Sequence, residues 1–299
     1  MTQENLDWLH AGKGISPSLR WSFGTDAPLV CFQTARETGD IFAADSSGGI
    51  YRLDRLGRIK SLTRGLKDIR ALAWSDTGQF GIVQVGESSL CQFNQKMEVE
   101  WTLDQEDPIL SVAVSPFGRH VALGLANGKT VILNSRKRHV ADFETIRPLR
   151  FLQFLVTEPT IIGAAEYGLL CSYDVDGKQL FSEKIWGNIG DLSASGDGNT
   201  IMLAAFNLGI QAYDGGGANR ASYIVEGTAK NVSTSFTGDR VVVATLERHL
   251  YWTDSDGELL WATRTEEEIH GVICDPLGEW IVCGFESGRL IRLDWDSPA

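Results

Sequence analysis

Seven acidic or amide residues recur along the chain in a pattern that could, by residue type, ligate metal ions. They stand 40 positions apart and are Asp54, Asn94, Asn134, Asp174, Asp214, Asp254 and Asp294. The runs at 174–177 and 254–257 read Asp-x-Asp-Gly, but neither continues to the third oxygen ligand and distal Glu of a calcium loop. Asp and Asn accept hydrogen bonds from backbone N–H groups two residues on, and Gly adopts the positive φ of a hairpin. We therefore expect hairpin turns, with no metal and no cofactor.

Other residue types with chemical potential show no catalytic arrangement. The five histidines and five cysteines form no pair at zinc-ligand spacing, and Gly215-Gly-Gly217 opens no phosphate loop. Ser195 lacks the flanking glycines of a nucleophile elbow. The repeat has no long insertion that could close over a reacting centre. We expect no catalytic residues and no enzyme activity.

The cysteines favour a reducing compartment. They number five, which is odd, and stand at Cys31, Cys91, Cys171, Cys274 and Cys283. No C-x-x-C pair occurs, and most lie in apolar runs that resemble buried strands. We expect free thiols and a cytoplasmic protein.

The elements that must position these residues follow from the same period. A ladder of Gly78, Gly118, Gly198, Gly238 and Gly278 keeps the 40-residue step, and each glycine ends a turn that begins with Ser or Asp. Short apolar, β-branched runs flank every turn. A period of 40 with four strands per unit predicts an all-β, seven-bladed β-propeller whose blades each hold four antiparallel strands.

The unit boundaries predict how the ring closes. A tail at 1–13 precedes a single propeller at 14–299, with blades near 29–64, 69–104, 109–144, 149–184, 189–224, 229–264 and 269–295. The last unit stops before its fourth strand, and Trp21 stands at the missing position of the period. We expect 18–24 to complete the seventh blade and cover its open edge.

The turns Ser115-Pro-Phe-Gly118 and Asp275-Pro-Leu-Gly278, with the 40-residue step and the interleaved closure, resemble the WD40-like and quinoprotein-like propeller superfamily. The resemblance covers nearly the whole chain. No unit has the family's Gly-His dipeptide, and none has its Trp-Asp at the end of the third strand, where Tyr173-Asp174 and Tyr213-Asp214 stand instead. The His–Asp network of that family is therefore not expected, and no cofactor residues carry over.

The regular turns lie on one face of such a ring, which directs attention to the irregular opposite face. Large apolar residues expected there are candidates for anchoring a partner protein: Tyr167, Trp186, Phe206, Leu246 and Phe285. The alternative is that each packs against a neighbouring blade. Basic residues at one repeat position would ring the mouth of the axial channel and could hold an anion or acidic peptide: Arg70, Arg150, Lys230 and His270. Alternatively, they are a solvated rim.

Three functions remain open. The first is a non-catalytic platform for protein partners, and the second is a ligand-binding or enzymatic propeller that uses the basic mouth. The third is a subunit that docks through Leu6, Trp8 and Leu9. A net charge of −12 argues against nucleic acid as partner. No apolar run long enough to span a membrane and no signal peptide occur in the sequence.

Overall fold

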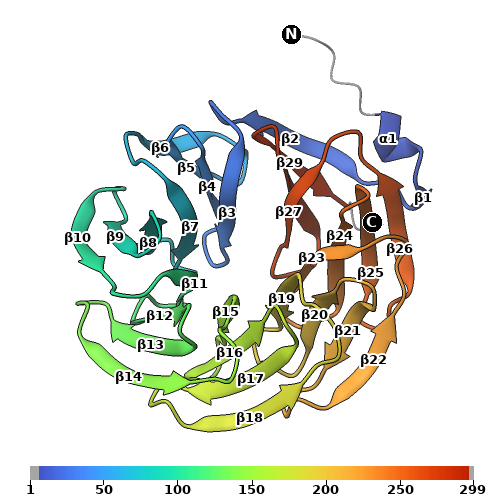
Figure 1. Ribbon diagram of the computed structural model, residues 1–299. Helices are drawn as coiled ribbons and strands as arrows, with labels where there is room; N and C mark the ends of the chain where they lie inside the picture. Colours follow the sequence, from blue (N-terminus) through green and yellow to red (C-terminus); the bar gives the residue numbers. More distant parts are fainter. Residues whose placement is uncertain (1–6, 296–299) are drawn as a thin grey trace.

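Seven antiparallel sheets are arranged in a ring around a central axis, as the ribbon of the computed structural model shows (Figure 1). Six have four strands, and blade six has a fifth. The structure describes residues 7–295. The first and innermost strands are β3 (Leu29–Ala35), β7 (Ile69–Trp74), β11 (Ile109–Val114), β15 (Phe151–Phe154), β19 (Asp191–Ala194), β23 (Ala229–Thr234) and β27 (Ile269–Cys274). The second strands are β4 (Asp40–Asp45), β8 (Phe80–Val85), β12 (His120–Leu125), β16 (Thr160–Ala165), β20 (Ile201–Ala205), β24 (Arg240–Thr245) and β28 (Trp280–Phe285).

The outer half of each blade completes the sheet. The third strands are β5 (Ile50–Leu53), β9 (Ser89–Asn94), β13 (Lys129–Asn134), β17 (Leu169–Asp174), β21 (Gly209–Tyr213), β25 (His249–Asp254) and β29 (Arg289–Asp294). The fourth and outermost strands are β6 (Ile59–Thr63), β10 (Val99–Asp104), β14 (His139–Glu144), β18 (Gln179–Lys184), β22 (Asn219–Tyr223), β26 (Leu259–Arg264) and β2 (Ser18–Gly24). The predicted fold class is confirmed.

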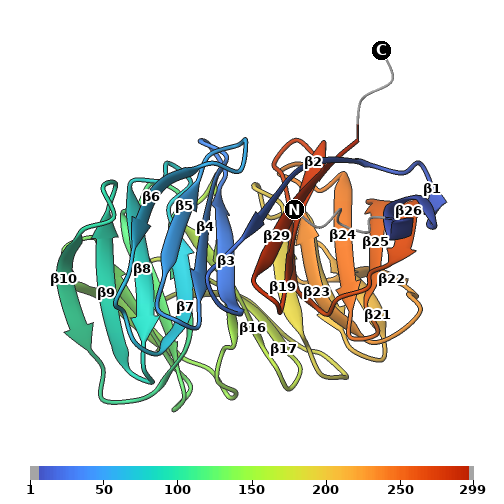
Figure 2. The same cartoon turned by 90° about the horizontal axis from the view of Figure 1, so that it is seen from above.

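The strand β2 closes the ring as predicted. It pairs antiparallel with β29 in the seventh blade, and Trp21 stands opposite Arg292. The seventh blade thus joins the N-terminal part of the chain to its C-terminal part (Figures 1 and 2). Closure leaves the third strand of this blade without a free edge.

Both repeated ladders form turns, and these turns lie on one face of the ring, which we call the turn face. The Asp54 carboxylate accepts hydrogen bonds from the N–H groups of Leu56 and Arg58, and the next five members of the Asp/Asn ladder bond in the same way. The N–H of Arg58 lowers the pKa of Asp54. In the glycine ladder, Gly78 has a φ of 68°. The hairpin interpretation is confirmed for the first six members of the Asp/Asn ladder, whereas Asp294 ends β29 and pairs with Arg292 at 2.6 Å.

Adjacent blades are joined by one side chain of each outermost strand, which reaches the third strand or the hairpin of the next blade. Trp21 and Trp101 donate their indole N–H groups to the carbonyls of Arg55 and Ser135. Tyr223 donates its hydroxyl to the carbonyl of Ser255. The full set of these inter-blade anchors is Trp21, Thr63, Trp101, Phe143, Phe181, Tyr223 and Trp261. Each closes one junction of the ring.

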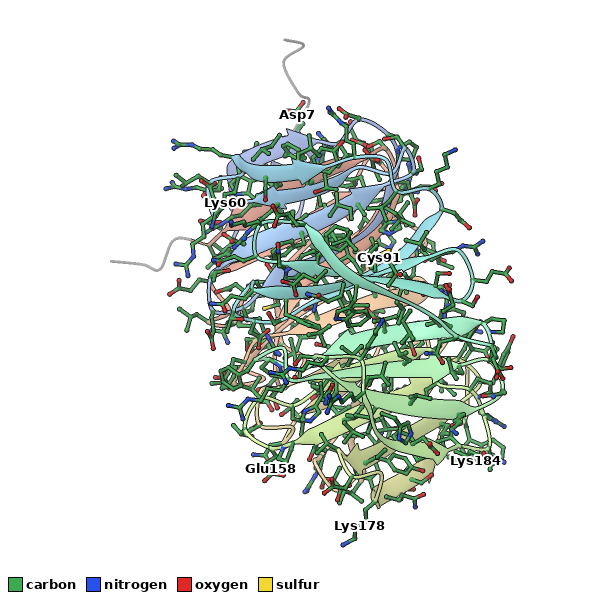
Figure 3. All side chains as sticks on the ribbon, turned by 90° about the vertical axis from the view of Figure 1, so that its left-hand side faces the viewer. Asp7, Lys60, Cys91, Glu158, Lys178 and Lys184 are labelled. Atoms are coloured by element: carbon green, nitrogen blue, oxygen red, sulfur yellow. The ribbon has the colours of Figure 1, made fainter. Side chains whose placement is uncertain are left out.

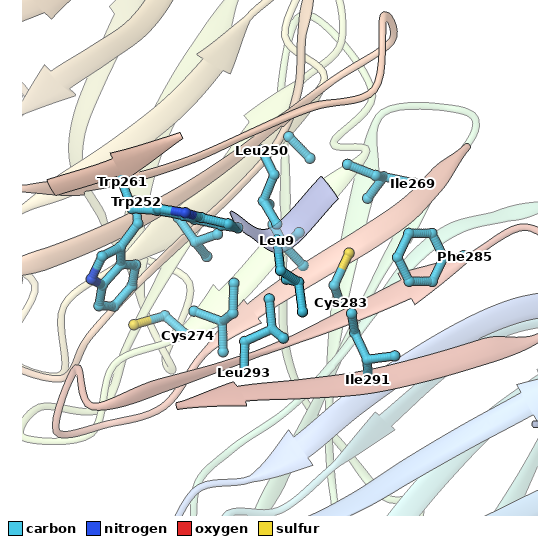
Figure 4. Packing of buried hydrophobic residues seen from close by; sticks show 14 of the residues in the cluster. Leu9, Leu250, Trp252, Trp261, Ile269, Cys274, Cys283, Phe285, Ile291 and Leu293 are labelled. Carbon is cyan, nitrogen blue, oxygen red and sulfur yellow. The ribbon is translucent and has the colours of Figure 1, made fainter. Parts of the chain in front are cut away.

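The short N-terminal elements pack on the junction between blades six and seven. The helix α1 (Asp7–His10) contacts β26, and β1 (Lys13–Gly14) pairs with β26 as a fifth strand of blade six. Trp8 and Leu9 are buried in the cluster that holds Trp252, Trp261 and other core side chains (Figure 4). The docking role predicted for Trp8 and Leu9 is wrong, because both are covered by this chain. Leu6 lies outside the described residues.

Candidate functional site

The innermost strands enclose an axial cavity of about 740 Å³, to which all seven blades contribute. The inner edge of a blade presents backbone groups that need partners. Side chains of the preceding blade supply several of them. The Gln153 side chain accepts a hydrogen bond from the N–H of Ala194 and donates one to its carbonyl. The Ser193 hydroxyl accepts a hydrogen bond from the N–H of Thr234. These contacts hold neighbouring blades together and occupy polar groups of the cavity wall.

One position of the repeat makes the waist of the cavity apolar. It falls on the innermost strand of every blade and is occupied by Phe32, Leu72, Val112, Leu152, Leu192, Val232 and Val272. The arrangement places an apolar ring between two polar mouths. At the mouth on the turn face, Arg36 is paired with Asp76 at 2.9 Å.

The four basic residues predicted at the other mouth do not act as one group. Arg70 and Arg150 line the cavity, and Lys230 and His270 lie outside its lining and share Glu286, with Nζ–Oε1 and Nδ1–Oε1 distances of 3.6 and 3.1 Å. Arg70 pairs with Asp68 at 3.1 Å. These carboxylates offset the positive charge that the sequence pattern predicts.

Asp191 is an acidic group in the cavity wall. Its carboxylate accepts the N–H of Val232 at 3.1 Å and that of Leu192 at 2.8 Å. Burial raises the pKa of Asp191 to about 6, against these hydrogen bonds, which lower it. The side chain thus titrates near neutrality while it joins blades five and six.

The face opposite the turn face carries the loops between second and third strands and the connections between blades, and we call it the loop face. Glu158 and Lys184 of blade four lie toward opposite faces of the ring (Figure 3). Three of the predicted anchors are exposed on the loop face. Trp186 is 79% exposed, Tyr167 63% and Leu246 54%. Exposure on this scale makes these residues available to a partner.

The other two predicted anchors are placed differently. Phe285 is completely buried and its prediction as an anchor is wrong, because it ends strand β28 and points into the core between blades six and seven. Phe206 is half-buried, and its ring stands 2.6 Å from where a Cβ on Gly190 would lie. The glycine at position 190, where neighbouring blades carry a longer side chain, therefore makes room for Phe206.

Three further exposed residues join Tyr167, Trp186 and Leu246 on the loop face. Ile146 and Ile224 lie in connections between blades, Leu208 lies in the loop between β20 and β21, and Ile224 is 95% exposed. The sequence analysis missed them, although they stand at the loop positions of the repeat. We call the six residues the apolar arc: Ile146, Tyr167, Trp186, Leu208, Ile224 and Leu246.

Contacts between successive loops place the residues of the apolar arc on neighbouring loops. Arg147, in the connection before blade four, donates to the carbonyl of Gly168. The N–H of Ile185, in the connection after blade four, donates to the same carbonyl. The Leu208 side chain lies 3.0 Å from where a Cβ on Gly187 would stand. Further along, the N–H of Leu246 bonds to the carbonyl of Thr228. The arc thus crosses from the entry to blade four as far as blade six.

Among the described residues, the turns of the turn face carry fewer exposed large apolar side chains than the six of the apolar arc. Leu56, Phe117 and Leu277 are exposed there, in the turns of blades one, three and seven. Isolated apolar residues of this kind are common on protein surfaces. The loop face is therefore the better candidate for a binding surface.

Catalytic chemistry finds little support in the geometry. Over residues 7–295, no group of three or more His, Cys, Asp or Glu side chains is placed to hold a metal ion. All five cysteines are free thiols, and burial raises the pKa of Cys31 and Cys171 to about 12. A thiol with so high a pKa is a poor nucleophile at neutral pH. Within the same range, no helix is long and apolar enough to cross a membrane.

Comparison with known proteins supports the architecture. Neither protein-family models nor curated proteins give a match to the chain. Among solved structures, the chain is similar to the β-propeller domain of Cps50 (Swd1) from Myceliophteria thermophila, with a TM-score of 0.79 and 15% identity. The match covers 93% of this chain and 99% of that one. The solved structure and the seven sheets of this chain therefore agree on a β-propeller fold, which in this chain has seven blades.

Proposed function

We propose that the protein is a non-catalytic platform that binds a partner protein through the apolar arc. The observation that carries the proposal is the gathering of six exposed apolar side chains on adjacent loops of one face. Large apolar patches on a folded domain mark interaction sites, and aromatic residues such as Tyr167 and Trp186 are typical energetic anchors. Free thiols at all five cysteines are consistent with a reducing compartment such as the cytoplasm.

The test compares what co-purifies with two variants of the tagged protein from its source. In the arc variant, Tyr167→Ser, Trp186→Ser and Leu246→Ser remove three anchors. In the control, Phe117→Ser and Leu277→Ser remove exposed apolar side chains of the turn face. We expect the arc variant to lose a co-purifying protein that the wild type and the control retain. Identical co-purification by all three, or none by the wild type after crosslinking, would contradict the proposal.

A second candidate function is the binding of a small anion in the axial cavity. It is favoured by Arg70 and Arg150, both of which line the cavity, and by the cavity's volume of about 740 Å³. The pairing of Arg70 with Asp68 speaks against strong binding. Thermal unfolding with inorganic phosphate or citrate tests it, because a ligand that binds the native state raises the unfolding temperature. An increase that Arg150→Gln abolishes would favour this candidate.

A further inference from the structure

The outer side of the junction between blades four and five is open, and one position of the repeat explains why. This position lies on the outermost strand, two residues after that of Trp261, and we call it the covering position. Its seven residues are Phe23, Thr63, Leu103, Phe143, Glu183, Tyr223 and Thr263. Glu183 is exposed, whereas the other six are buried or half-buried. The covering position is thus closed in six blades and open in blade four.

In two blades the covering residue is an aromatic ring that lies on the third strand of the next blade. Phe23 meets Tyr51 edge-on, with a centroid distance of 5.5 Å. Phe143 stacks on Tyr173, with a centroid distance of 3.7 Å. The third strand at these junctions therefore lies under an aromatic ring.

The open junction between blades four and five is a groove of about 520 Å³. Its lining includes Gln211 and Tyr213 of β21, which stand at the repeat positions of Tyr51 and Tyr173. The Gln211 oxygen accepts the Ser222 hydroxyl at 2.7 Å, and its amide nitrogen donates to a backbone carbonyl at 2.8 Å. The amide is thus hydrogen-bonded within blade five, and an aromatic ring can lie on it without leaving a polar atom unpaired.

The groove extends from one face of the ring to the other. Trp186 and Leu208 of the apolar arc line it toward the loop face, and Gly216 and Gly217 line it toward the turn face. The strand β18 borders it on the circumference of the ring (Figure 1). Among the described strands, none pairs with the outer edge of β18. That edge can accept a further strand.

The corresponding groove between blades six and seven is filled by the chain itself. Thr263, a small side chain at the covering position, donates its hydroxyl to the carbonyl of Trp8. Trp8 and Leu9 are buried in the cluster that contains Leu293 (Figure 4). The chain then pairs antiparallel with β26 through β1, which places α1 toward the C-terminal end of β26 and the loop face. A short segment with an aromatic residue thus closes a junction whose covering residue is small.

We propose that a segment of the partner protein docks between blades four and five as the N-terminal segment docks between blades six and seven. The inference rests on the proposed function, because Trp186 and Leu208 belong to the apolar arc, and it adds where and in what form the partner binds. The segment places one aromatic side chain on Gln211 and Tyr213, beside Trp186. It then pairs antiparallel with the free edge of β18, so that main-chain hydrogen bonds add to the contact.

Glu183 selects among the aromatic side chains. Burial raises the pKa of Tyr213 and the charge of Glu183 adds to this effect, which places the Glu183 carboxylate near the lining of the groove. Thr263 donates a hydrogen bond to its segment, whereas the Glu183 carboxylate accepts one. Tryptophan and tyrosine carry a donor on the ring and phenylalanine does not. We therefore expect Trp or Tyr in the partner segment.

Close approach to the outermost strand requires glycine in the segment. A Cβ on Gly12 would lie 2.3 Å from the carbonyl oxygen of Ala262, and one on Gly14 would lie 2.1 Å from that of Leu260. A segment that docks in the same way on β18 meets the same backbone. We expect its glycines to follow the aromatic residue at the spacing with which Gly12 and Gly14 follow Trp8.

The experiment selects a random twelve-residue peptide library, displayed on phage, against the full chain. Selection runs in parallel on Glu183→Phe, which introduces the residue that stands at the covering position in blades three and seven. The matched control Glu183→Gln removes the charge, keeps an acceptor and leaves the groove open. The arc variant is the third sample. Fluorescence anisotropy then measures the affinity of the selected peptides, and urea unfolding measures the stability of each variant.

We expect the wild type and Glu183→Gln to enrich peptides in which Trp or Tyr precedes glycine. Glu183→Phe should bind these peptides about tenfold more weakly or worse, because its ring occupies the place of theirs. It should be at least as stable as the wild type, because that ring fills the groove. N-methylation of alternate backbone amides of a peptide should weaken binding in only one of the two alternating patterns, since a strand pairs through every second residue.

The outcomes separate failure of the inference from failure of the proposed function. Peptides that the arc variant loses and Glu183→Phe binds as the wild type does would overturn the inference and leave the platform standing. Equal enrichment on the wild type and the arc variant, or none on either, would overturn both.

Three further results would overturn the inference alone. The first is selection of peptides without an aromatic residue, and the second is a Glu183→Phe chain less stable than the wild type, which would show that the groove does not accept a ring. The third is self-association of the wild type, in sedimentation velocity, that Glu183→Phe abolishes. It would assign the groove to a second copy of the chain.

Discussion

At the scale of single residues, the protein uses the same chemical group in opposite ways according to its surroundings. Asp214 lies at an exposed hairpin, where the N–H of Ala218 lowers its pKa. Asp191 lies in the wall of the axial cavity, where burial raises its pKa to about 6 although two N–H groups donate to it. Repeat position alone does not reveal this difference, because it depends on how much water reaches each carboxylate.

The raised pKa of Asp191 predicts how the free energy of unfolding changes with pH. Because the pKa of Asp191 is higher in the folded state than its ordinary 3.8, the native state binds the proton more tightly. The resulting stabilisation is complete below about pH 4 and is lost as the pH rises through 6. We expect the free energy of unfolding of wild type relative to Asp191→Asn to fall between pH 4 and 7, by up to about 3 kcal/mol. Urea unfolding at several pH values measures it.

Asp214→Asn is the control, because the pH dependence of stability should have the opposite sign there. The pKa of Asp214 is lowered in the folded state, so the stability that the Asp214 carboxylate contributes is lost as the pH falls. The fold tolerates Asn at this position of the repeat, since Asn94 and Asn134 form the same turn. A wild-type advantage over Asp191→Asn that stayed constant from pH 4 to 7 would contradict the role assigned to Asp191.

At the scale of elements, the inter-blade anchors alternate between two positions of the outermost strand. Trp21, Trp101, Phe181 and Trp261 share one position of the 40-residue repeat, whereas Thr63, Phe143 and Tyr223 stand two residues later. Successive blades therefore use the two positions in turn. A ring with an odd number of blades cannot complete such an alternation, and blades six and seven both use the first position. The helix α1 packs at this same junction.

Three anchors pack directly on a glycine of the hairpin that they reach: Trp21 on Gly57, Phe181 on Gly217 and Tyr223 on Gly257. Gly217 has a φ of 86°, and a Cβ there would lie 2.6 Å from the Phe181 ring. Gly65 also has a positive φ, of 99°, but has no atom within 4 Å of its Cβ position. We expect Gly65→Ala to cost about 1 kcal/mol of stability for backbone strain alone. Gly217→Ala should cost about 1–3 kcal/mol more, because Phe181 must move.

Chemical denaturation of these two variants tests the contact between blades four and five. The double variants with Phe181→Leu provide the control, since a smaller side chain makes room at position 217 and changes nothing at position 65. Equal destabilisation by Gly65→Ala and Gly217→Ala would show that the Phe181 contact contributes nothing beyond strain.

At the scale of the whole molecule, the N-terminal segment seals the ring at two places. The strand β2 completes blade seven, and α1 with β1 covers blade six, where Thr263 donates to the carbonyl of Trp8. Trp295 stacks on Trp252 with a centroid distance of 4.8 Å and donates its indole N–H to the carbonyl of Ile15. The two ends of the described chain are thus tied together across this junction.

Two truncations separate the roles of these elements. A chain that begins at residue 17 loses α1 and β1, and with them the burial of Trp8 and Leu9. It should keep the oligomeric state of the full chain but be less stable, by about 3–5 kcal/mol. A chain that begins at residue 25 also loses β2, which uncovers the edge of β29, and should self-associate. Denaturation and sedimentation velocity measure both outcomes.

The full-length variant Trp8→Ala should reproduce most of the stability loss expected for the chain that begins at residue 17. The matched Trp186→Ala should not, because Trp8 is 5% exposed and Trp186 79%. A monomeric, equally stable chain that begins at residue 25 would contradict the closure of the ring by β2.

The sequence by itself determined the period, the turns and the closing strand. These follow from local rules: Asp, Asn and Gly form turns wherever they recur, and Trp21 keeps the phase of a strand that the C-terminal unit lacks. Only the tertiary structure decided which apolar side chains are exposed. Phe285 and Leu246 both stand near the end of a second strand, yet Phe285 enters the core and Leu246 faces solvent. Exposure depends on what the neighbouring blade supplies, and a one-residue difference at a strand end turns a side chain to the other side of the sheet.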